Sequence, residues 1–291
     1  MSKPNRVDLF KFIDKRFVYP KLSNVDLSFV RIGGIGLANC MFVAARAYIL
    51  AQINHWELID PTWFKISLGP YIRREKDKRH YRRLFAKSGI TGLRKCLILV
   101  FGKKCQEYDS MPKKGVIMIV GLGNYFEDLL PYHGLVFSYF LSITQSSSME
   151  KVNAVNFNNI VGVHVRLGDY VSSLRTPIDW YENMIGQIEA VLSGQLQFYI
   201  FSDGTDEEIS RLLTIGNVSR FFCGNALADI WALSKCRLII GSDSTFSGWG
   251  AFLGQVPIIY QKCHYGNVLK EKNNQLVIDN GVIPNTFLER I

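Results

Sequence analysis

Side chains that can bind an anion end an apolar segment in the second half of the chain. His164 and Arg166 close residues 160–166, where valines alternate with them, so the two side chains share one face of a predicted strand. A charge against an apolar strand is costly unless it is paired, so Arg166 needs a partner. Its planar set of N–H donors suits phosphate oxygens. The segment therefore predicts a phosphate-binding site.

Hydroxyl and carboxylate side chains end two further apolar segments. They are Ser202 and Asp203 after residues 197–201, and Ser244, Thr245, Phe246 and Ser247 after residues 237–241. The second group opens a predicted helix, whose first N–H groups and dipole favour a phosphate. Simple N-capping is the alternative role for Ser244 or Thr245. For His164 the alternative is a structural place in its strand.

The elements that must position these residues alternate regularly along the chain. The predicted strands are 160–166, 197–201, 218–222, 237–241 and 256–260, and the predicted helices are 179–192, 227–234, 245–253 and one that begins at Thr205 with Glu208 in a capping box. Such alternation indicates a doubly wound parallel sheet, which binds ligands beyond the carboxyl ends of its strands. Asp169, just after Arg166, could accept a proton there. Its alternative role is to hold the turn.

The first half of the chain predicts a second α/β unit. A strand at 28–32, the glycine-rich run 33–39, a helix at 40–52 and a strand at 56–60 indicate a parallel sheet. Gly34, Gly36 and Asp60 imitate a dinucleotide-binding fingerprint, so an oxidoreductase is one alternative. However, Asn39 stands where the fingerprint has its last glycine, and that function leaves the motifs at the other strand ends unexplained.

Composition sets limits on the class of protein. The chain of 291 residues contains no apolar run long enough to span a membrane and no apolar signal-peptide core, so we expect a cytoplasmic protein. A polar stretch at 144–159 is the expected boundary between domains 1–150 and 151–291. The six cysteines include no C-x-x-C pair and suggest neither a zinc site nor a disulfide scaffold.

Positive charge is concentrated in residues 65–114, which carry 15 Lys or Arg and 4 Asp or Glu. Such a segment attracts the phosphates of nucleic acid, of anionic lipid or of a phosphorylated acceptor. An apolar stretch at 97–101 lies between basic flanks and suits an interfacial helix. A solvated helix face is the alternative, and an RNA-binding or lectin-like module is another, although the chain shows no RNA-binding motif.

The motifs together resemble the α-1,2-fucosyltransferase family, glycosyltransferase family 11. The resemblance is carried by VGVHVRLGDYV at 161–171, FYIFSD at 198–203, LADIWALSKCRLIIGSDSTFSGWGAFLG at 227–254 and GGIGLAN at 33–39, with a weaker echo in GLGNYFED at 121–128. Three positions depart from the family's pattern: related sequences often have a second arginine where this chain has Leu167, an aromatic residue where it has Gly248, and a glutamine in the segment GNYFED.

The resemblance implies a GT-B type fold, in which two Rossmann-like domains contain parallel sheets and the C-terminal domain binds the donor. It implies that Arg166 and His164 contact a diphosphate and that Asp229 accepts hydrogen bonds from guanine, whose paired donors suit a carboxylate. The alternative for Asp229 is an acid in the first turn of a helix. The other expected donor-binding residues are Gly34, Gly36, Asn39, Ser202, Asp203, Ser244, Thr245, Phe246 and Ser247.

The implied reaction is transfer of L-fucose from GDP-fucose to a galactoside hydroxyl in α-1,2 linkage, with inversion and without a metal or cofactor. The sequence contains no D-x-D motif and no cluster of His and Cys ligands, which agrees with a metal-independent reaction. The expected partners are a GDP-sugar, a glycan or lipid-linked oligosaccharide acceptor of bacterial surface polysaccharide (O-antigen) synthesis, and an anionic membrane at its inner face, but no nucleic acid. Another donor sugar or linkage is the nearest alternative.

Overall fold

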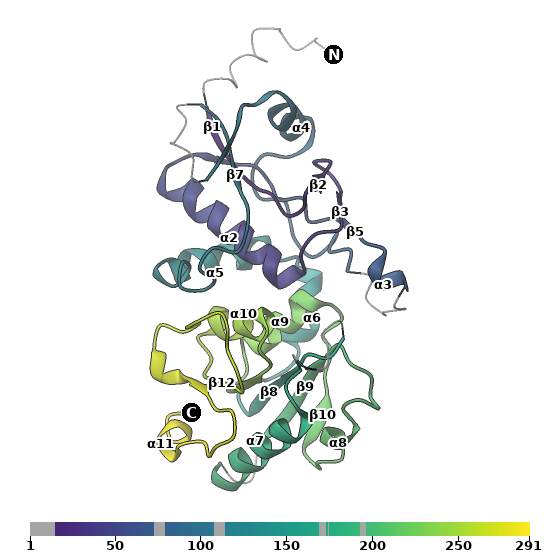
Figure 1. The fold of residues 1–291 in the computed structure, drawn as a ribbon, viewed down its shortest axis with the longest axis vertical. Helices are drawn as coiled ribbons and strands as arrows, with labels where there is room; N and C mark the ends of the chain where they lie inside the picture. Colours follow the sequence, from purple (N-terminus) through teal and green to yellow (C-terminus); the bar gives the residue numbers. More distant parts are fainter. Residues whose placement is uncertain (1–14, 73–78, 108–113, 169–172, 174, 193–195) are drawn as a thin grey trace. The chain divides into compact units, whose positions relative to one another are not determined.

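The computed structural model describes residues 15–72, 79–107, 114–168, 173, 175–192 and 196–291 (Figure 1). The chain forms two compact units, 1–145 and 146–291, so the division lies five residues before the expected one. The polar stretch expected at the boundary is not a linker throughout, because residues Ser146–Asn153 form helix α6 of the second unit.

The first unit contains two sheets and the helices around them. Its strands are β1 (Arg16–Pro20), β2 (Val25–Asp26), β3 (Arg31–Ile32), β4 (Glu57–Leu58), β5 (Lys65–Ile66), β6 (Lys104–Gln106) and β7 (Gly115–Ile119), and its helices are α2 (Leu37–Ile53), α3 (Gly69–Ile72), α4 (Gly92–Phe101), η2 (Leu130–Tyr132) and α5 (His133–Ile143). A four-stranded parallel sheet has the order β4-β1-β7-β6, and β2, β3 and β5 form a separate three-stranded sheet. The expected interfacial helix at 97–101 is the second half of α4, where Val100 and Phe101 are exposed.

The expected opening strand at 28–32 is wrong in both extent and place. Only Arg31–Ile32 is a strand, and it pairs with β2 and β5 rather than with the parallel sheet. Ser28 has a positive φ of 72°, and the Leu27 N–H donates to the Val30 carbonyl at 2.9 Å, so residues 27–30 make a turn. A dinucleotide-binding fingerprint would require the glycine run to follow a strand of the parallel sheet, and here it does not.

The second unit is a single parallel sheet between helices. Its strands are β8 (Ile160–Val165), β9 (Gln197–Ser202), β10 (Val218–Arg220), β11 (Leu238–Gly241), β12 (Ile258–Tyr260) and β13 (Gln275–Val277), and its helices are α6, α7 (Ile178–Val191), α8 (Ser210–Leu213), α9 (Ala226–Leu233), α10 (Thr245–Gly254), η4 (Lys272–Asn274) and α11 (Asn285–Leu288). The five expected strands are present, and β13 was not expected. The capping box forms between Thr205 and Glu208, but the regular helix after it is only α8.

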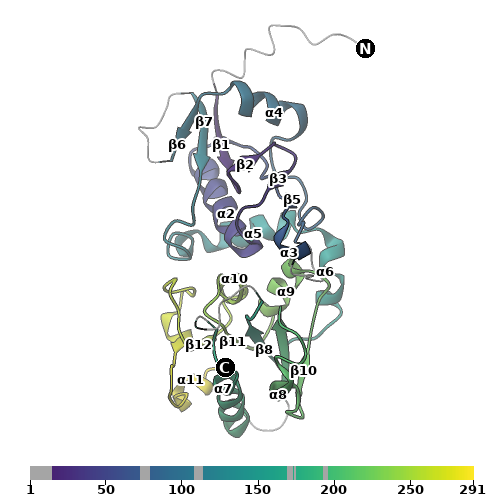
Figure 2. The same cartoon turned by 45° about the vertical axis from the view of Figure 1, so that its right-hand side comes forward.

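The order of this sheet is β10-β9-β8-β11-β12-β13, and every neighbouring pair is parallel. In Figure 2 the labels β12, β11, β8 and β10 follow one another across the sheet. All six residues of β8 are buried, which is typical of a central parallel strand covered on both faces. The chain runs outward from β8 to β10 on one side and from β11 to β13 on the other. The direction therefore reverses between β8 and β11, where open α/β sheets bind their ligands.

Candidate functional site

The carboxyl ends of β8 and β11 lie side by side at this reversal point. His164 is the register partner of Gly241, so Arg166 and Ser242 follow their strands at the same edge. The hydroxyl of Ser242 donates to the His164 carbonyl at 2.7 Å and accepts the Arg166 backbone N–H at 2.8 Å. The buried phenol of Tyr181 lies 2.8 Å from the same hydroxyl. Ser242 and Tyr181, which the sequence did not single out, therefore fix the backbone that presents Arg166.

The guanidinium of Arg166 is paired with Asp203 at the end of the neighbouring strand β9. Its NH1 atom lies 2.5 Å from Oδ2, and the two side chains are 22% and 25% exposed. The other carboxylate oxygen accepts the N–H groups of Leu167 at 2.9 Å and Gly168 at 3.1 Å. A Cβ at Gly168 would lie 2.3 Å from Asp203 Oδ2, so a larger residue there would have to displace this carboxylate. Asp203 thus holds both the arginine and the loop that follows it, and Ser202 lies beside it with its hydroxyl accepting the Gly204 N–H.

His164 is buried beneath this edge, with 4% of its surface exposed. Its ring stacks on Phe246 with centroids 4.8 Å apart. Its pKa is lowered to about 3, mainly by burial and next by the charge of Arg166, whereas Asp203 acts in the opposite direction. The imidazole is therefore neutral at physiological pH. Its buried Nδ1 atom has no hydrogen-bond partner among the described residues, which is unusual for an interior polar atom.

The start of α10 faces the same edge, because it follows β11 directly. Ser244 is the N-cap, and its hydroxyl accepts the Phe246 N–H at 3.3 Å, so its alternative role as a cap is present. Ser247 is completely buried and its hydroxyl donates to the carbonyls of Ser242 and Ser244. Its side chain therefore shapes the turn. Thr245 is the first residue of the helix, and the backbone N–H groups of this turn are what a phosphate would meet.

Asp229 lies in the first turn of α9 and is 8% exposed. Its Oδ1 atom accepts the backbone N–H of Cys223 at 2.8 Å and so holds the loop before the helix. Asn225, not Asp229, caps this helix by accepting the Ala228 N–H at 2.9 Å. The first-turn alternative for Asp229 is thus present, and its expected contact with guanine stays a prediction.

The remaining expected donor residues lie in the first unit. Gly34 has a positive φ of 87°, and a Cβ there would lie 2.7 Å from the Leu22 carbonyl oxygen. Gly36 is the N-cap of α2, and Asn39 is half-buried in its first turn.

Two buried cations support this glycine-rich loop. Arg31, with no exposed surface, donates from NH1 to the Gly33 carbonyl at 2.9 Å, and the Lys65 ammonium donates to the Gly34 carbonyl at 3.0 Å. The sequence did not single them out, because both occupy short strands within a basic or apolar context.

The expected proton acceptor, Asp169, lies outside the described residues. The described part of the same edge contains a carboxylate–imidazole pair, which the sequence did not indicate and which could also accept a proton. His264, in the loop after β12, has its Nδ1 atom 2.7 Å from Asp243 Oδ1, and its backbone N–H donates to the same oxygen at 3.1 Å. His264 is half exposed, and Asp243 stands between Ser242 and the helix cap. By its position the pair lies beside the expected anion site.

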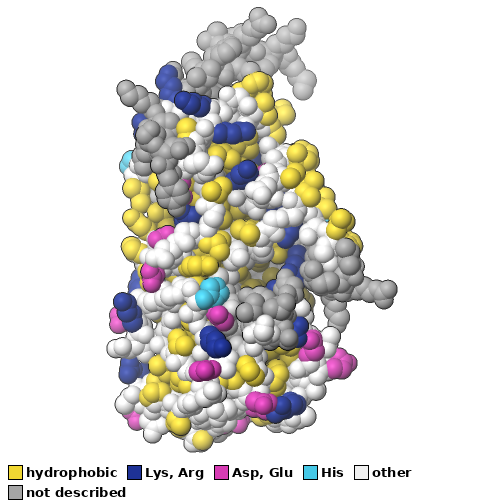
Figure 3. All heavy atoms as spheres, viewed as in Figure 1, with side chains coloured by type: hydrophobic (Ala, Val, Ile, Leu, Met, Phe, Trp, Pro, Cys, Tyr) yellow, Lys and Arg dark blue, Asp and Glu magenta, His cyan; other side chains and the backbone are white. Residues whose placement is uncertain are grey.

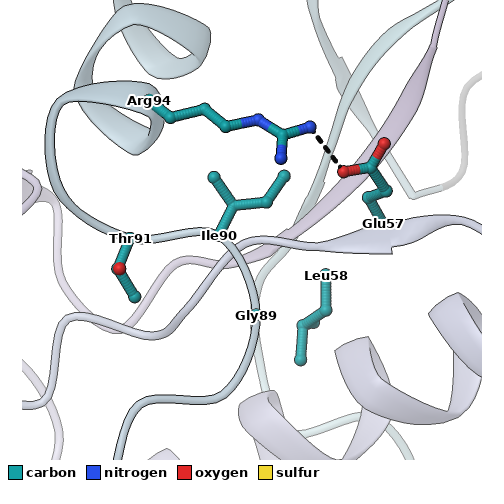
Figure 4. A pocket seen from close by; sticks show the side chains of 6 residues that line it. All are labelled: Glu57, Leu58, Gly89, Ile90, Thr91 and Arg94. Atoms are coloured by element: carbon teal, nitrogen blue, oxygen red, sulfur yellow. Dashed lines mark hydrogen bonds and ion pairs between the residues drawn. The ribbon is translucent and has the colours of Figure 1, made fainter.

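A pocket in the first unit contains none of the expected site residues (Figure 4). Its lining comes from β4 and from the turn before α4, and Arg94 crosses it to pair with Glu57 at 2.6 Å. Lys15 pairs with the same carboxylate, so the negative charge of Glu57 is already neutralised by two cations. Within the described ranges no three His, Cys, Asp or Glu side chains are grouped to hold a metal ion, and no helix is long and apolar enough to cross a membrane.

Comparison with known proteins connects this edge to one family. The sequence model of "Glycosyl transferase family 11" matches residues 136–268. Over 105 residues the chain is 31% identical to "O-antigen biosynthesis glycosyltransferase WbnK" of Escherichia coli, which covers 33% of this chain and 34% of that protein. It is 28% identical over 115 residues to "Alpha-1,2-colitosyltransferase" of Escherichia coli, covering 36% and 39%. The matched part thus spans between a third and two fifths of these relatives.

Solved structures share the fold at low sequence identity. The alpha-1,6-fucosyltransferase NodZ co-crystallised with GDP has a TM-score of 0.55 at 15% identity, covering 84% of this chain and 94% of that one. NodZ from Bradyrhizobium gives 0.53 at 16% identity, with 84% and 95% covered. A mutant of Arabidopsis thaliana FUT1 in complex with GDP gives 0.52 at 13%, with 92% and 76% covered.

The expected fold class, an α/β protein of GT-B type with parallel sheets, is confirmed by these neighbours. The matched residues contain β8, β9 and β11 with Arg166, Asp203 and the start of α10. Residues 136–268 therefore match glycosyl transferase family 11, as the motifs at 161–171 and 227–254 predicted.

Proposed function

We propose that this chain transfers L-fucose from GDP-fucose to a galactoside hydroxyl of a glycan, forming an α-1,2 linkage with inversion and without a metal ion. One observation carries the proposal: at the reversal point of the parallel sheet, Arg166 and the start of α10 stand together within the part that matches family 11. This pairs a cation with the N–H groups of a helix start, which is the chemistry that a diphosphate requires.

The side chains of this edge would stabilise the departing diphosphate. In the reaction the acceptor oxygen bonds to the anomeric carbon, the bond from that carbon to the phosphate oxygen breaks, and its electron pair leaves with GDP. The acceptor proton passes to a base, for which Asp169 is our first candidate and the Asp243–His264 pair the second. Arg166 would neutralise the charge that develops on the β-phosphate, and the neutral imidazole of His164 could donate one hydrogen bond to it.

Preorganisation by the protein supports this assignment of roles. Asp203, Ser242 and Tyr181 hold the loop of Arg166 through bonds that exist before any ligand binds. Fixed donors cost no reorganisation during the reaction, so they stabilise the leaving group more than flexible ones would. A carboxylate at Asp229 would read guanine at the far end of the nucleotide, while one of its oxygens keeps its bond to Cys223.

A second candidate is transfer of a different sugar from a GDP donor, or formation of a different linkage. It is favoured by the relative named as an alpha-1,2-colitosyltransferase, while the structural neighbour NodZ is described as an alpha-1,6-fucosyltransferase. We also propose a glycan or lipid-linked oligosaccharide of O-antigen synthesis as the acceptor, which the name of the first relative supports. The protein would then work at the cytoplasmic side of the membrane, with residues 65–114 in peripheral contact.

The test is a donor and acceptor screen with the purified chain. GDP-fucose and other GDP-sugars are offered with a panel of galactosides, and products are identified by mass spectrometry and NMR of the new linkage. We expect fucosyl transfer that persists in excess EDTA and is lost in Arg166→Ala, with a β-linked donor giving an α-linked product. Transfer only from a different GDP-sugar would establish the second candidate. Stabilisation by NAD but not by GDP in a thermal shift assay would refute both.

A further inference from the structure

The three-stranded sheet of the first unit has one apolar face that the described residues of that unit leave exposed. Val25, Ile32 and Ile66 are register partners across β2, β3 and β5, so their side chains form one row. They are 49%, 54% and 43% exposed. A sheet with one face in water usually has polar residues on that face, and here the exposed residues are aliphatic. A row of three exposed aliphatic side chains in register marks an interaction surface.

The opposite face of this sheet fixes which side points outward. Arg31 and Lys65 are also register partners, and both are buried. Their cationic groups donate to the carbonyls of Gly33 and Gly34, so neither can turn outward without breaking the support of the glycine loop. Because side chains alternate along a strand, burial of these two forces Ile32 and Ile66 to face away.

Loops at both ends extend the row. Leu27 and Phe29 stand in the turn between β2 and β3 and are 50% and 71% exposed, and Leu68, after β5, is 74% exposed. The turn is held by a hydrogen bond, in which Asp26 Oδ1 accepts the Ser28 N–H at 2.9 Å. Large apolar side chains are thus held in water by a structured turn rather than by a loose one.

A basic border accompanies this face. Phe64 alternates with Lys65 and so lies on the side of Ile66, and the guanidinium of Arg82 lies 5.3 Å over its ring. Arg83 and Lys87 follow and are exposed. In Figure 3 hydrophobic side chains gather over β2 and β3. We call the row, the two loops and Phe64 the apolar sheet face: Val25, Leu27, Phe29, Ile32, Phe64, Ile66 and Leu68.

We propose that the apolar sheet face inserts into the headgroup region of an anionic bilayer, with Arg82 and Arg83 on the lipid phosphates. Apolar side chains beside arginines suit such an interface, where the first are buried in the acyl boundary and the second meet negative charge. A second copy of the chain fits less well, since residues 65–114 would bring like charges together. The inference rests on the proposed peripheral membrane contact and not on the proposed transferase activity. Two strands of the apolar sheet face, β2 and β3, lie outside the segment 65–114.

The experiment measures partitioning of the full chain onto vesicles of phosphatidylcholine with about a third phosphatidylglycerol, by flotation. Phe29→Ser and Leu68→Ser should each lower the partition coefficient at least about tenfold, because each removes an apolar side chain that the bilayer would bury. Arg82→Gln should lower it about fivefold. The matched control is Val282→Ser, which removes an 80% exposed apolar side chain from the second unit and should change it less than about twofold.

Depth is measured with Phe29→Trp, whose added fluorescence should be quenched by lipids brominated in the acyl chain, while that of Val282→Trp should not. Unchanged thermal melts and unchanged transfer to a soluble acceptor establish that the variants are folded, and they separate this inference from the transferase proposal. Equal partitioning of wild type, Phe29→Ser and Leu68→Ser would overturn it. So would absence of wild-type binding, or a dimer in sedimentation that Phe29→Ser dissociates.

Discussion

Replacing Arg166 by alanine tests whether this side chain serves a ligand or only its neighbour Asp203. In the structure the guanidinium pairs with a carboxylate that also accepts the N–H groups of Leu167 and Gly168. After the replacement these two bonds remain, and Asp203 is still a quarter exposed and solvated. Ion pairs that keep contact with water contribute about 0–1 kcal/mol, and this pair is about a quarter exposed, so the free energy of unfolding should fall by about 1 kcal/mol.

The expected loss in nucleotide binding is larger. A hydrogen bond to a charged group contributes about 1.5–3 kcal/mol, so GDP should bind roughly ten- to 150-fold more weakly to Arg166→Ala. Arg166→Lys should fall between the alanine variant and wild type, because an ammonium keeps the charge but not the planar set of donors. If the arginine serves the ligand, Arg166→Ala should therefore lose more free energy of GDP binding than free energy of unfolding.

The assay is isothermal titration with GDP beside urea unfolding of the same samples. Arg237→Ala is the matched control, because Arg237 precedes β11 at the opposite edge of the sheet and donates to the carbonyl of Ile291 at 3.0 Å. It should leave GDP affinity unchanged. If Arg166→Ala binds GDP within twofold of wild type and loses only stability, the arginine merely balances Asp203, and the anion site is wrongly placed.

Three further predictions concern single residues of the second unit. Asp229→Asn should weaken GDP about tenfold or more but leave inosine diphosphate, which lacks the guanine amine, less affected in the same titrations; equal losses for both would argue for a structural role only. His164 has a pKa of about 3 in the folded protein and about 6.5 in the unfolded one, so between these pH values it takes up a proton only on unfolding. The free energy of unfolding should therefore fall by about 1 kcal/mol from pH 7 to 5.5 in urea titrations, and this fall should vanish in His164→Gln. Gly250→Ala would place a Cβ 2.6 Å from Leu233 and should cost about 1–3 kcal/mol of unfolding free energy, whereas Gly186→Ala, in an open position within α7, should gain about 0.4–1 kcal/mol; equal effects would contradict the close packing of α9 and α10.

Several features were predictable because they depend on local pattern. The run at 238–241 is apolar throughout and that at 160–165 is apolar except for His164, as is typical of strands buried on both faces, and the structure has β8 and β11 there. Polar residues that follow such strands must lie at one edge of a parallel sheet, which directed attention to Arg166 and Ser244. The opening strand of the first unit was mistaken for the same reason, since SFVRI has the composition of a strand and its turn at Ser28 has no strong signal.

The sequence alone therefore predicted the α/β class, the resemblance to glycosyl transferase family 11 and the edge at which we expect an anion to bind, because these follow from periodicity and from motifs of adjacent residues. Only the tertiary structure decided how that edge is built. It pairs Arg166 with Asp203 and joins Ser242 to Tyr181 across wide separations in the chain. It also turned the apolar row of β2, β3 and β5 outward. Such contacts depend on which strands become neighbours, and strand order is a property of the whole sheet that no local pattern contains.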